Sequence, residues 1–255
     1  MKIERQREFT PSGSNVHSDM PGSLSLDSVV RGATRQVSAG KYTLTLTYPS
    51  ALESGPLYEM TKRSADILIA SLLLIALFPI FALVALAVFL EDRGPILYYQ
   101  VRVGKNGKGF RFYKFRSMVT NADAIKAKLA AQNEADGPIF KMSNDPRITR
   151  IGRVLRRYSI DELPQLMNVL RGEMSLVGPR PHLPSEAALY TERQQLRTQV
   201  QPGLLCFREV FGRSKMTFEE WVELDLLYIE HRSMRTDLLI LMRTIPAVLS
   251  AEGAY

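Results

Sequence analysis

The chain has 255 residues, and its 33 basic and 26 acidic side chains give a formal net charge of +7. One cysteine excludes a disulfide framework and an all-cysteine metal site, and a hydrophobic content of 45% excludes wholesale disorder. The length allows one large domain or two small ones. The mean hydropathy, −0.07, is typical of a soluble protein, but it averages over one strongly apolar segment.

Residues 1–57 are polar and rich in Ser, Thr and Gly. The stretch KYTLTLTY at residues 41–48 alternates like a short strand, although nothing obvious follows that could pair with it. We therefore predict a leader that is mostly disordered. A helix is expected over residues 58–66, leading into the apolar segment.

Residues 67–90 form an uncharged apolar run that is interrupted only by Ser71 and Pro79. A straight helix of this length would reach about 36 Å, against about 30 Å for the hydrocarbon core of a bilayer. A helix that is apolar on every face favours membrane insertion over a buried helix in a soluble protein. Pro79 removes a backbone donor near the middle of the run and so predicts a kink, which leaves two halves too short to cross.

Positive charge flanks both ends of this run, with Lys62 and Arg63 before it and Arg93 and Arg102 after it. Because cations mark the cytoplasmic side, a helix–break–helix that enters and leaves by one face fits both flanks. We therefore favour a re-entrant segment over residues 58–93. A conventional span with the leader outside the cell stays an alternative, since spanning helices tolerate proline.

Residues 94–255 read as one further domain. The alternating stretches 96–104 and 110–118 are joined by a turn with Asn106 and Gly107, which predicts a β-hairpin. Helices are expected over 122–135, 148–170, 185–200 and 217–231, and a loop over 174–184. The apolar stretch 237–249 is too short to span and is either a core helix or an interfacial one. The predicted fold class is α+β, mainly α: a re-entrant helix hairpin broken at Pro79, with a cytosolic domain of one small β-hairpin and amphipathic interfacial helices.

The adjacent acids Asp161 and Glu162 are the first candidate site. Composition alone is equally typical of solvated acids at a helix start. The arginines immediately upstream, Arg153 and Arg156 among them, point instead to a site for a phosphate and a metal.

Three further basic clusters could bind phosphates. Lys114 and Arg116 share one face of the second predicted strand, where the alternative is a basic strand lying against lipid headgroups. Arg180 stands between two prolines, which would present its guanidinium rigidly for bidentate binding. Arg213 follows a glycine in an expected turn.

Other chemistries find no support in the sequence. The three histidines are widely separated, Cys206 is solitary, and neither a Walker loop nor a dinucleotide fingerprint is present. The aromatic residues alternate into the predicted hairpin and do not form an evident stacking platform, so nucleic acid is not an expected partner. A phosphate-bearing substrate fits the charge best.

These segments resemble the bacterial sugar transferase family, whose members are monotopic polyprenyl-phosphate phosphoglycosyl transferases that initiate exopolysaccharide and O-antigen assembly. The resemblance covers residues 58–255. It is carried by KRSAD at 62–66, the apolar run with its central proline, GPILYYQVRVGKNGKGFRFYKFRSM, DPRITRIGRVLRRYSIDELPQLMNVLRGEMSLVGPRP and LDLLYIEHRSMRTDLLILMRTIPAVL.

The resemblance implies transfer of a sugar 1-phosphate from a nucleotide diphosphate sugar, usually a UDP-sugar, to undecaprenyl phosphate, with release of UMP. It implies that Asp161 is the nucleophile of a covalent phosphosugar-aspartate, and that Asp161 and Glu162 hold Mg²⁺. The residues that would line the phosphate pocket are Lys114, Arg116, Arg156, Arg180 and Arg213. The implied location is the bacterial inner membrane, with the catalytic domain in the cytoplasm and a homodimer left open.

Two features depart from the family pattern. The family commonly reads PGITGWAQV or PGLTGLWQV where this chain has PGLLCFREV at residues 202–210, so the sugar stays undetermined. The leader 1–57 has no match. The rival interpretation is a non-catalytic basic module on the membrane surface that binds anionic lipid or an assembly partner, and the intact Asp161–Glu162 pair argues against it.

Overall fold

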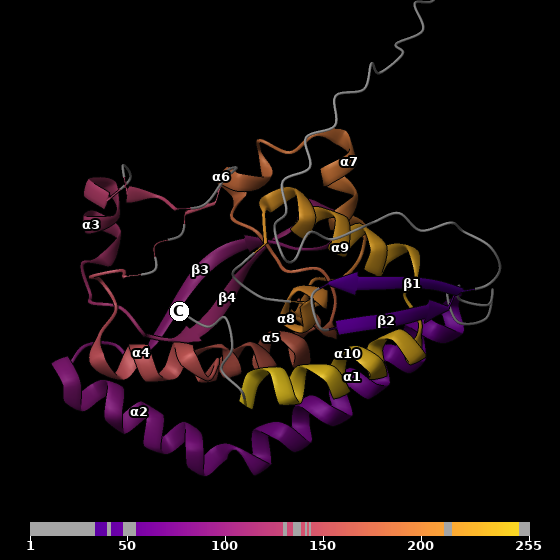
Figure 1. The fold of residues 1–255 in the computed structure, drawn as a ribbon. Helices are drawn as coiled ribbons and strands as arrows, with labels where there is room; N and C mark the ends of the chain where they lie inside the picture. Colours follow the sequence, from indigo (N-terminus) through magenta and orange to yellow (C-terminus); the bar gives the residue numbers. More distant parts are fainter. Residues whose placement is uncertain are drawn as a thin grey trace, which may run out of the picture.

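A computed structural model describes residues 34–39, 42–47, 55–129, 132–134, 139–140, 142, 144–211 and 216–249 (Figure 1). The elements are, in chain order, β1 (Thr34–Ala39), β2 (Tyr42–Thr47), α1 (Pro56–Ala76), α2 (Phe78–Asp92), β3 (Leu97–Val103), β4 (Gly109–Phe115), α3 (Ala122–Leu129), α4 (Arg150–Arg157), α5 (Leu166–Arg171), β5 (Ser175–Val177), α6 (Pro184–Ala187), α7 (Glu192–Gln195), β6 (Gly203–Leu205), α8 (Phe207–Phe211), α9 (Phe218–Glu230) and α10 (Met234–Leu249). The predicted mainly helical fold with a small β-hairpin is confirmed.

The apolar run folds as the two helices α1 and α2, which are bent by 61° at Leu77. Pro79 is the second residue of α2, so its missing N–H falls in the first turn, where no intrahelical partner is needed. Within the described residues, no single helix is long and apolar enough to cross a bilayer, and only this bent pair passes such a test jointly, by length and composition. The large apolar side chains left more than half exposed include Leu72, Ile75, Phe78, Leu83, Leu86 and Leu90.

The polar first half of α1 binds the rest of the domain. Lys62 Nζ donates to Asp237 Oδ2 of α10 at 2.7 Å, and Arg63 donates to the main-chain oxygens of Val169 and Leu170 at the end of α5. Asp66 is buried and accepts from the N–H of Leu176 in β5 at 3.0 Å. The KRSAD motif therefore fixes α1 to three separate elements of the domain.

The strands β3 and β4 form the predicted antiparallel hairpin, with Tyr99 opposite Tyr113. Asn106 and Gly107 in its turn have φ of 57° and 76°, the left-handed conformations that an Asn-Gly turn requires. Asn168 of α5 accepts from the N–H of Tyr113 and donates to the carbonyl of Arg111, so β4 is attached to α5.

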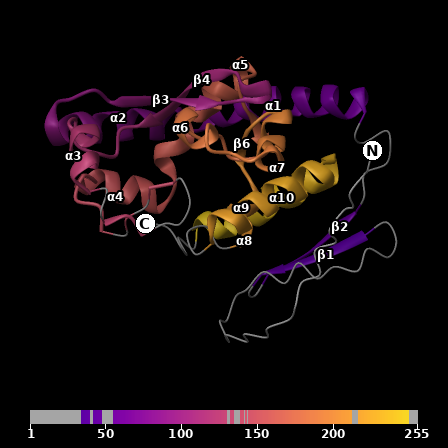
Figure 2. The same ribbon diagram turned by 90° about the horizontal axis from the view of Figure 1, so that it is seen from above.

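Two short parallel strands, β5 and β6, lie beside the core, with Ser175 paired to Gly203 and Val177 to Leu205. A side chain at residue 203 cannot be accommodated, because a Cβ there would lie 2.0 Å from the backbone N of Gly178. Seen from above, β6 lies between the hairpin β3–β4 and α10, and β5 pairs with it (Figure 2). The loops that leave their carboxyl ends therefore start side by side.

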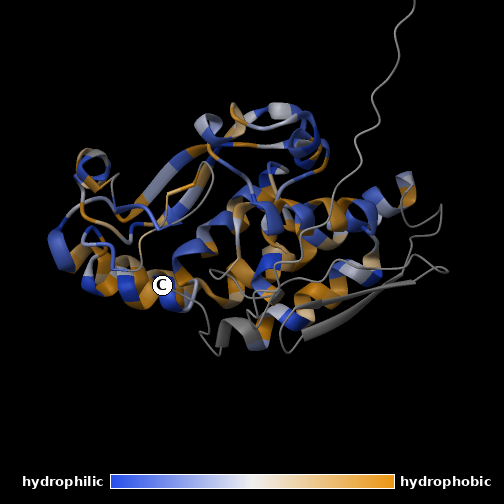
Figure 3. Ribbon diagram, turned by 45° about the horizontal axis from the view of Figure 1, so that its top comes forward, coloured by the Kyte–Doolittle hydropathy of each residue, from blue (hydrophilic) through white to orange (hydrophobic). Residues whose placement is uncertain are grey.

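The main core joins β4, α5, β5, α8, α9 and α10 through buried residues such as Phe112, Leu166, Phe207, Leu224 and Ile240. A second cluster packs Val84 and Val88 of α2 against Phe115 and Leu155. Apolar residues recur along the helices, whereas much of the upper loop region is hydrophilic (Figure 3).

Several local predictions need correction. The helix expected over 148–170 is interrupted at Ser159, whose φ of 55° is left-handed, and residues 160–165 continue as a 3₁₀ helix. Residues 175–177 of the predicted loop form β5, because Gly178 and Gly203 let two backbones approach. In place of one helix over 185–200 there are the short helices α6 and α7 and a 3₁₀ helix over Leu196–Gln199, and the helix expected over 122–135 is described only to Leu129. The strand predicted at 41–48 is present as β2, and its partner β1 precedes it. Most of the predicted leader lies outside the described residues.

Candidate active site

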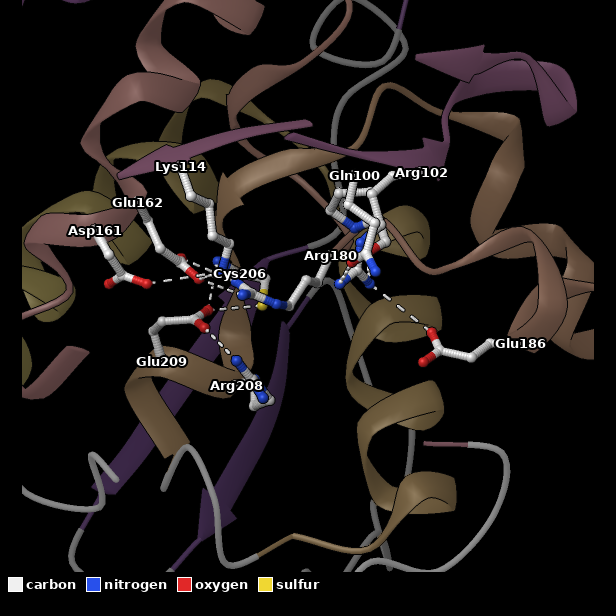
Figure 4. A network of polar contacts seen from close by, with 11 residues as sticks. Gln100, Arg102, Lys114, Asp161, Glu162, Arg180, Glu186, Cys206, Arg208 and Glu209 are labelled. Carbon is white, nitrogen blue, oxygen red and sulfur yellow. Dashed lines mark hydrogen bonds and ion pairs between the residues drawn. The ribbon is translucent and has the colours of Figure 1, made fainter. Parts of the chain in front are cut away.

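The two adjacent acids lie in the 3₁₀ helix Ile160–Gln165, directly beneath the strand β4. Lys114 Nζ of β4 is 2.7 Å from Glu162 Oε1 and 4.0 Å from Asp161 Oδ2 (Figure 4). Arg180 Nη1 donates to Glu162 Oε2 at 3.1 Å, and its Nη2 donates to Oε1. Glu162 is thus bound by two cations, while Asp161 is 95% buried and, among the described residues, has only Lys114 within ion-pair range.

The environments of the two carboxyls shift their pKa values in opposite directions. Burial disfavours ionisation of Glu162, but the charges of Arg180 and Lys114 outweigh it and hold the pKa of Glu162 well below its usual range. Burial raises the pKa of Asp161, Lys114 opposes this rise, and the charge of Glu162 adds to it. Burial also lowers the pKa of Lys114, which Glu162 and Asp161 counteract.

Arg180 reaches the acids because it follows the strand β5. The loop Pro179–Arg180–Pro181 begins at the carboxyl end of β5. The N–H of the adjoining Gly178 donates to the carbonyl oxygen of Leu205 in β6 at 2.9 Å. The close approach of Gly178 and Gly203 fixes where this loop starts. The arginine between two prolines is therefore held on a short, constrained connection, as the sequence indicates.

The structure places the other predicted site residues as follows. Arg156 lies in the last turn of α4, and its positive charge opposes the rise in the pKa of Asp161. Arg116 instead binds Asp92 at the end of α2, with Nη1 2.6 Å from Oδ2, and makes no described contact with the acids. Arg213 lies outside the described residues.

Sequence reasoning missed a third acid, Glu209 of α8, whose side chain is 11% exposed. Its Oε2 accepts from the backbone N–H and the thiol of Cys206 at 3.0 and 2.7 Å, and its Oε1 accepts from Arg208 at 3.1 Å. In Figure 4 its carboxylate lies beside the Glu162–Lys114–Arg180 cluster. The sequence feature that could have indicated Glu209 is the atypical segment 202–210, which contains Arg208 and Glu209.

The carboxylates Asp161 and Glu162 fit Mg²⁺ in one specific way. Among the described residues, no three His, Cys, Asp or Glu side chains are arranged to enclose a metal ion. Mg²⁺ is commonly held by only one or two protein carboxylates together with substrate phosphates and water. The two acids therefore suit an ion that arrives with a diphosphate.

Taken together, the fold and site define a mainly helical domain that holds a buried acidic pair with two cations and is fixed to a bent apolar helix pair. The model of the family described as bacterial sugar transferase matches residues 57–251, and the chain belongs to this family. It is accordingly a transferase.

Three relatives illustrate the similarity. The chain is 41% identical over 204 residues to the exopolysaccharide production protein ExoY of Sinorhizobium fredii. This alignment covers 78% of this chain and 90% of the relative. The chain is 41% identical over 227 residues to the undecaprenyl-phosphate glucose phosphotransferase of Komagataeibacter xylinus, covering 85% and 40%. It is 39% identical over 201 residues to the undecaprenyl-phosphate galactose phosphotransferase of Salmonella typhimurium, covering 76% and 41%. The chain thus spans about two fifths of the length of these two phosphotransferases.

Proposed function

We propose that the protein transfers a sugar 1-phosphate from a UDP-sugar to undecaprenyl phosphate and releases UMP, as the first membrane step of exopolysaccharide or O-antigen synthesis. The observation that carries the proposal is the buried carboxylate of Asp161 beside Glu162, which is bound by Lys114 and Arg180. Family membership and the names of two relatives, both undecaprenyl-phosphate sugar phosphotransferases, support it.

In the first step, a carboxylate oxygen of Asp161 attacks the sugar-bearing phosphorus, and the bond from that phosphorus to the oxygen of the UMP leaving group breaks. A phosphate oxygen of undecaprenyl phosphate then attacks the same phosphorus and expels Asp161. The product is a lipid-linked diphosphate sugar, and the carboxylate is regenerated. Lys114 and Arg180 neutralise the diphosphate, without which an anionic nucleophile would be repelled.

Asp161 must be ionised to act as the nucleophile. Because burial raises its pKa, the rate should fall with decreasing pH at a higher pH than for an exposed aspartate. Mg²⁺ would be held by Asp161 and Glu162, and it would supply further neutralisation of phosphate charge.

The bent pair α1–α2 supports a re-entrant membrane segment in the bacterial inner membrane, with the catalytic domain on the cytoplasmic face. Its exposed apolar side chains would contact lipid, and the cations at both ends would remain on one side. The stripe Leu238, Met242 and Ile245 on α10 is exposed and would lie at the interface. A domain held in this way can receive a lipid phosphate from the bilayer.

The test is UMP release from UDP-sugars by the full chain in detergent with Mg²⁺ and undecaprenyl phosphate. Asp161→Asn should abolish UMP release and the covalent phosphosugar adduct while leaving membrane association unchanged. Asp123→Asn, which changes an exposed aspartate on α3, should behave as wild type. Activity of Asp161→Asn near that of the wild type would contradict the nucleophile assignment. No UMP from any common UDP-sugar with the wild type would favour the non-catalytic lipid-binding module.

A further inference from the structure

The parallel strands β5 and β6 deliver two arginines to one place. Val177 pairs with Leu205, and each strand is followed three residues later by an arginine, Arg180 after β5 and Arg208 after β6. Because the carboxyl ends of parallel strands meet at one edge, residues in equivalent positions after them lie close together. Arg180 donates to Glu162 of the acidic pair, whereas Arg208 has no role in the phosphate binding proposed above.

Arg208 is held in a fixed orientation. Its guanidinium lies 4.4 Å from the ring centroid of Trp221, and it donates to Glu209 Oε1 at 3.1 Å. Its side chain is 21% exposed, while its Nε is buried with no hydrogen-bond partner among the described residues. The indole face and the carboxylate together restrict its rotamers.

Within the described part of the chain, the Glu209 carboxylate accepts fewer hydrogen bonds than its lone pairs allow. A carboxylate offers about four lone-pair positions, and here Oε2 takes two donors from Cys206 while Oε1 takes one from Arg208. Among the described residues, no further donor takes the remaining position on Oε1. In Figure 4 the Glu209 carboxylate lies beside the side chains of Glu162 and Arg180.

The chemistry of the donor shows what such a pair can recognise. In the proposed reaction the sugar is joined directly to the phosphorus that Asp161 attacks, so it must lie next to the acidic pair. Its hydroxyls both donate and accept hydrogen bonds. A carboxylate, which accepts hydrogen bonds, and a guanidinium, which donates them, form a pair suited to such hydroxyls.

We infer that Arg208 and Glu209 contact hydroxyls of the donor hexose and determine which sugar is accepted. This inference rests on the proposed function. It also gives a physical role to the segment 202–210, in which this chain departs from the family pattern.

The experiment measures kcat/KM for UMP release from UDP-glucose, UDP-galactose, UDP-N-acetylglucosamine and UDP-N-acetylgalactosamine, and from singly deoxygenated forms of the preferred donor. Glu209→Gln retains an amide oxygen for the N–H of Cys206, so the start of α8 should stay capped. It should change the ratio between two donors by about 10- to 100-fold, the loss expected for one hydrogen bond to a charged group. Arg208→Lys, which keeps the charge but loses the planar fork, should also alter the ratio.

The deoxygenated donors give the sharper result. One of them should be a poor donor for the wild type and should lose nothing more with Glu209→Gln, because the contact is already missing. The matched control is Glu223→Gln, which alters a partly exposed glutamate paired to Arg193 and should leave every ratio unchanged.

A uniform loss across all donors would overturn the inference and assign Glu209 to the capping of α8 alone. Unchanged ratios in both variants, with normal thermal unfolding, would overturn it as well. Absence of UMP release by the wild type from every donor would instead refute the proposed function, and this inference with it.

Discussion

Arg180→Lys tests whether the fork of the guanidinium, and not only its charge, matters for the site. Arg180 donates through both terminal nitrogens to the two oxygens of Glu162. A lysine keeps the charge but presents one compact ammonium, so at least one charge-assisted hydrogen bond is lost. Such a bond contributes about 1.5–3 kcal/mol, which corresponds to a roughly 10- to 150-fold lower kcat/KM if the same fork also binds substrate phosphate.

The assay is UMP release with and without the substitution, together with thermal unfolding to confirm the fold. Arg180→Met, which also removes the charge, should be less active than Arg180→Lys. The matched control is Arg193→Lys, since Arg193 makes a similar forked pair with Glu223 but is 58% exposed, where such pairs contribute only about 0–1 kcal/mol. Arg180→Lys with activity within twofold of the wild type would refute the reasoning.

Three further predictions concern stability. Glu162→Gln should lower Tm at pH 7, because the ionised Glu162 stabilises the folded state. This stabilisation is complete above the usual carboxyl pKa of 4.5 and is lost as pH falls from there through the lower pKa of the folded state, so the Tm difference should shrink in that range. A constant difference from pH 7 to 4 would contradict this. Gly203→Ala should cost at least about 2 kcal/mol, because its Cβ would lie 2.0 Å from the N of Gly178; an unchanged Tm would refute the close packing. Asp237→Leu should cost about 3–5 kcal/mol, because it leaves the partly buried Lys62 unpaired and removes the acceptor of the Tyr58 and Tyr228 hydroxyls. Adding Lys62→Met should recover part of the lost Tm, and no recovery would mean that the pair is not coupled.

Local signals in the sequence were enough for the elements that depend on local chemistry. The Asn-Gly pair at residues 106 and 107 predicted the hairpin, because few other residues adopt two successive left-handed conformations. Pro79 predicted the break in the apolar run, and the bend lies at Leu77, two residues before it. The alternation of 41–48 predicted β2. The partner strand was expected after it in the sequence, whereas the observed partner β1 precedes it.

Other features depend on contacts distant in the sequence, which spacing does not reveal. The alternation predicted that Arg116 shares a strand face with Lys114, but β4 ends at Phe115 and Arg116 binds Asp92 at the end of α2. The break at Ser159 turns the acids beneath β4, and no glycine or proline marks that position. The strand β5 has three residues, too few for a period, and its pairing depends on two glycines about 25 residues apart.

The helix α1 connects the site to the apolar pair without a hinge. Its first half is bound through Lys62, Arg63 and Asp66 to α10, α5 and β5, and Asp66 is followed directly by the apolar run. β5 is also the strand that precedes the loop with Arg180. The N–H of Leu176, which Asp66 binds, therefore lies four residues before the arginine that donates to Glu162. A continuous helix cannot change its direction between these residues without breaking backbone hydrogen bonds. The orientation of the acidic pair relative to α1 is therefore set by side-chain packing, and weakening the contacts of Asp66 should disturb the site as well as the anchor.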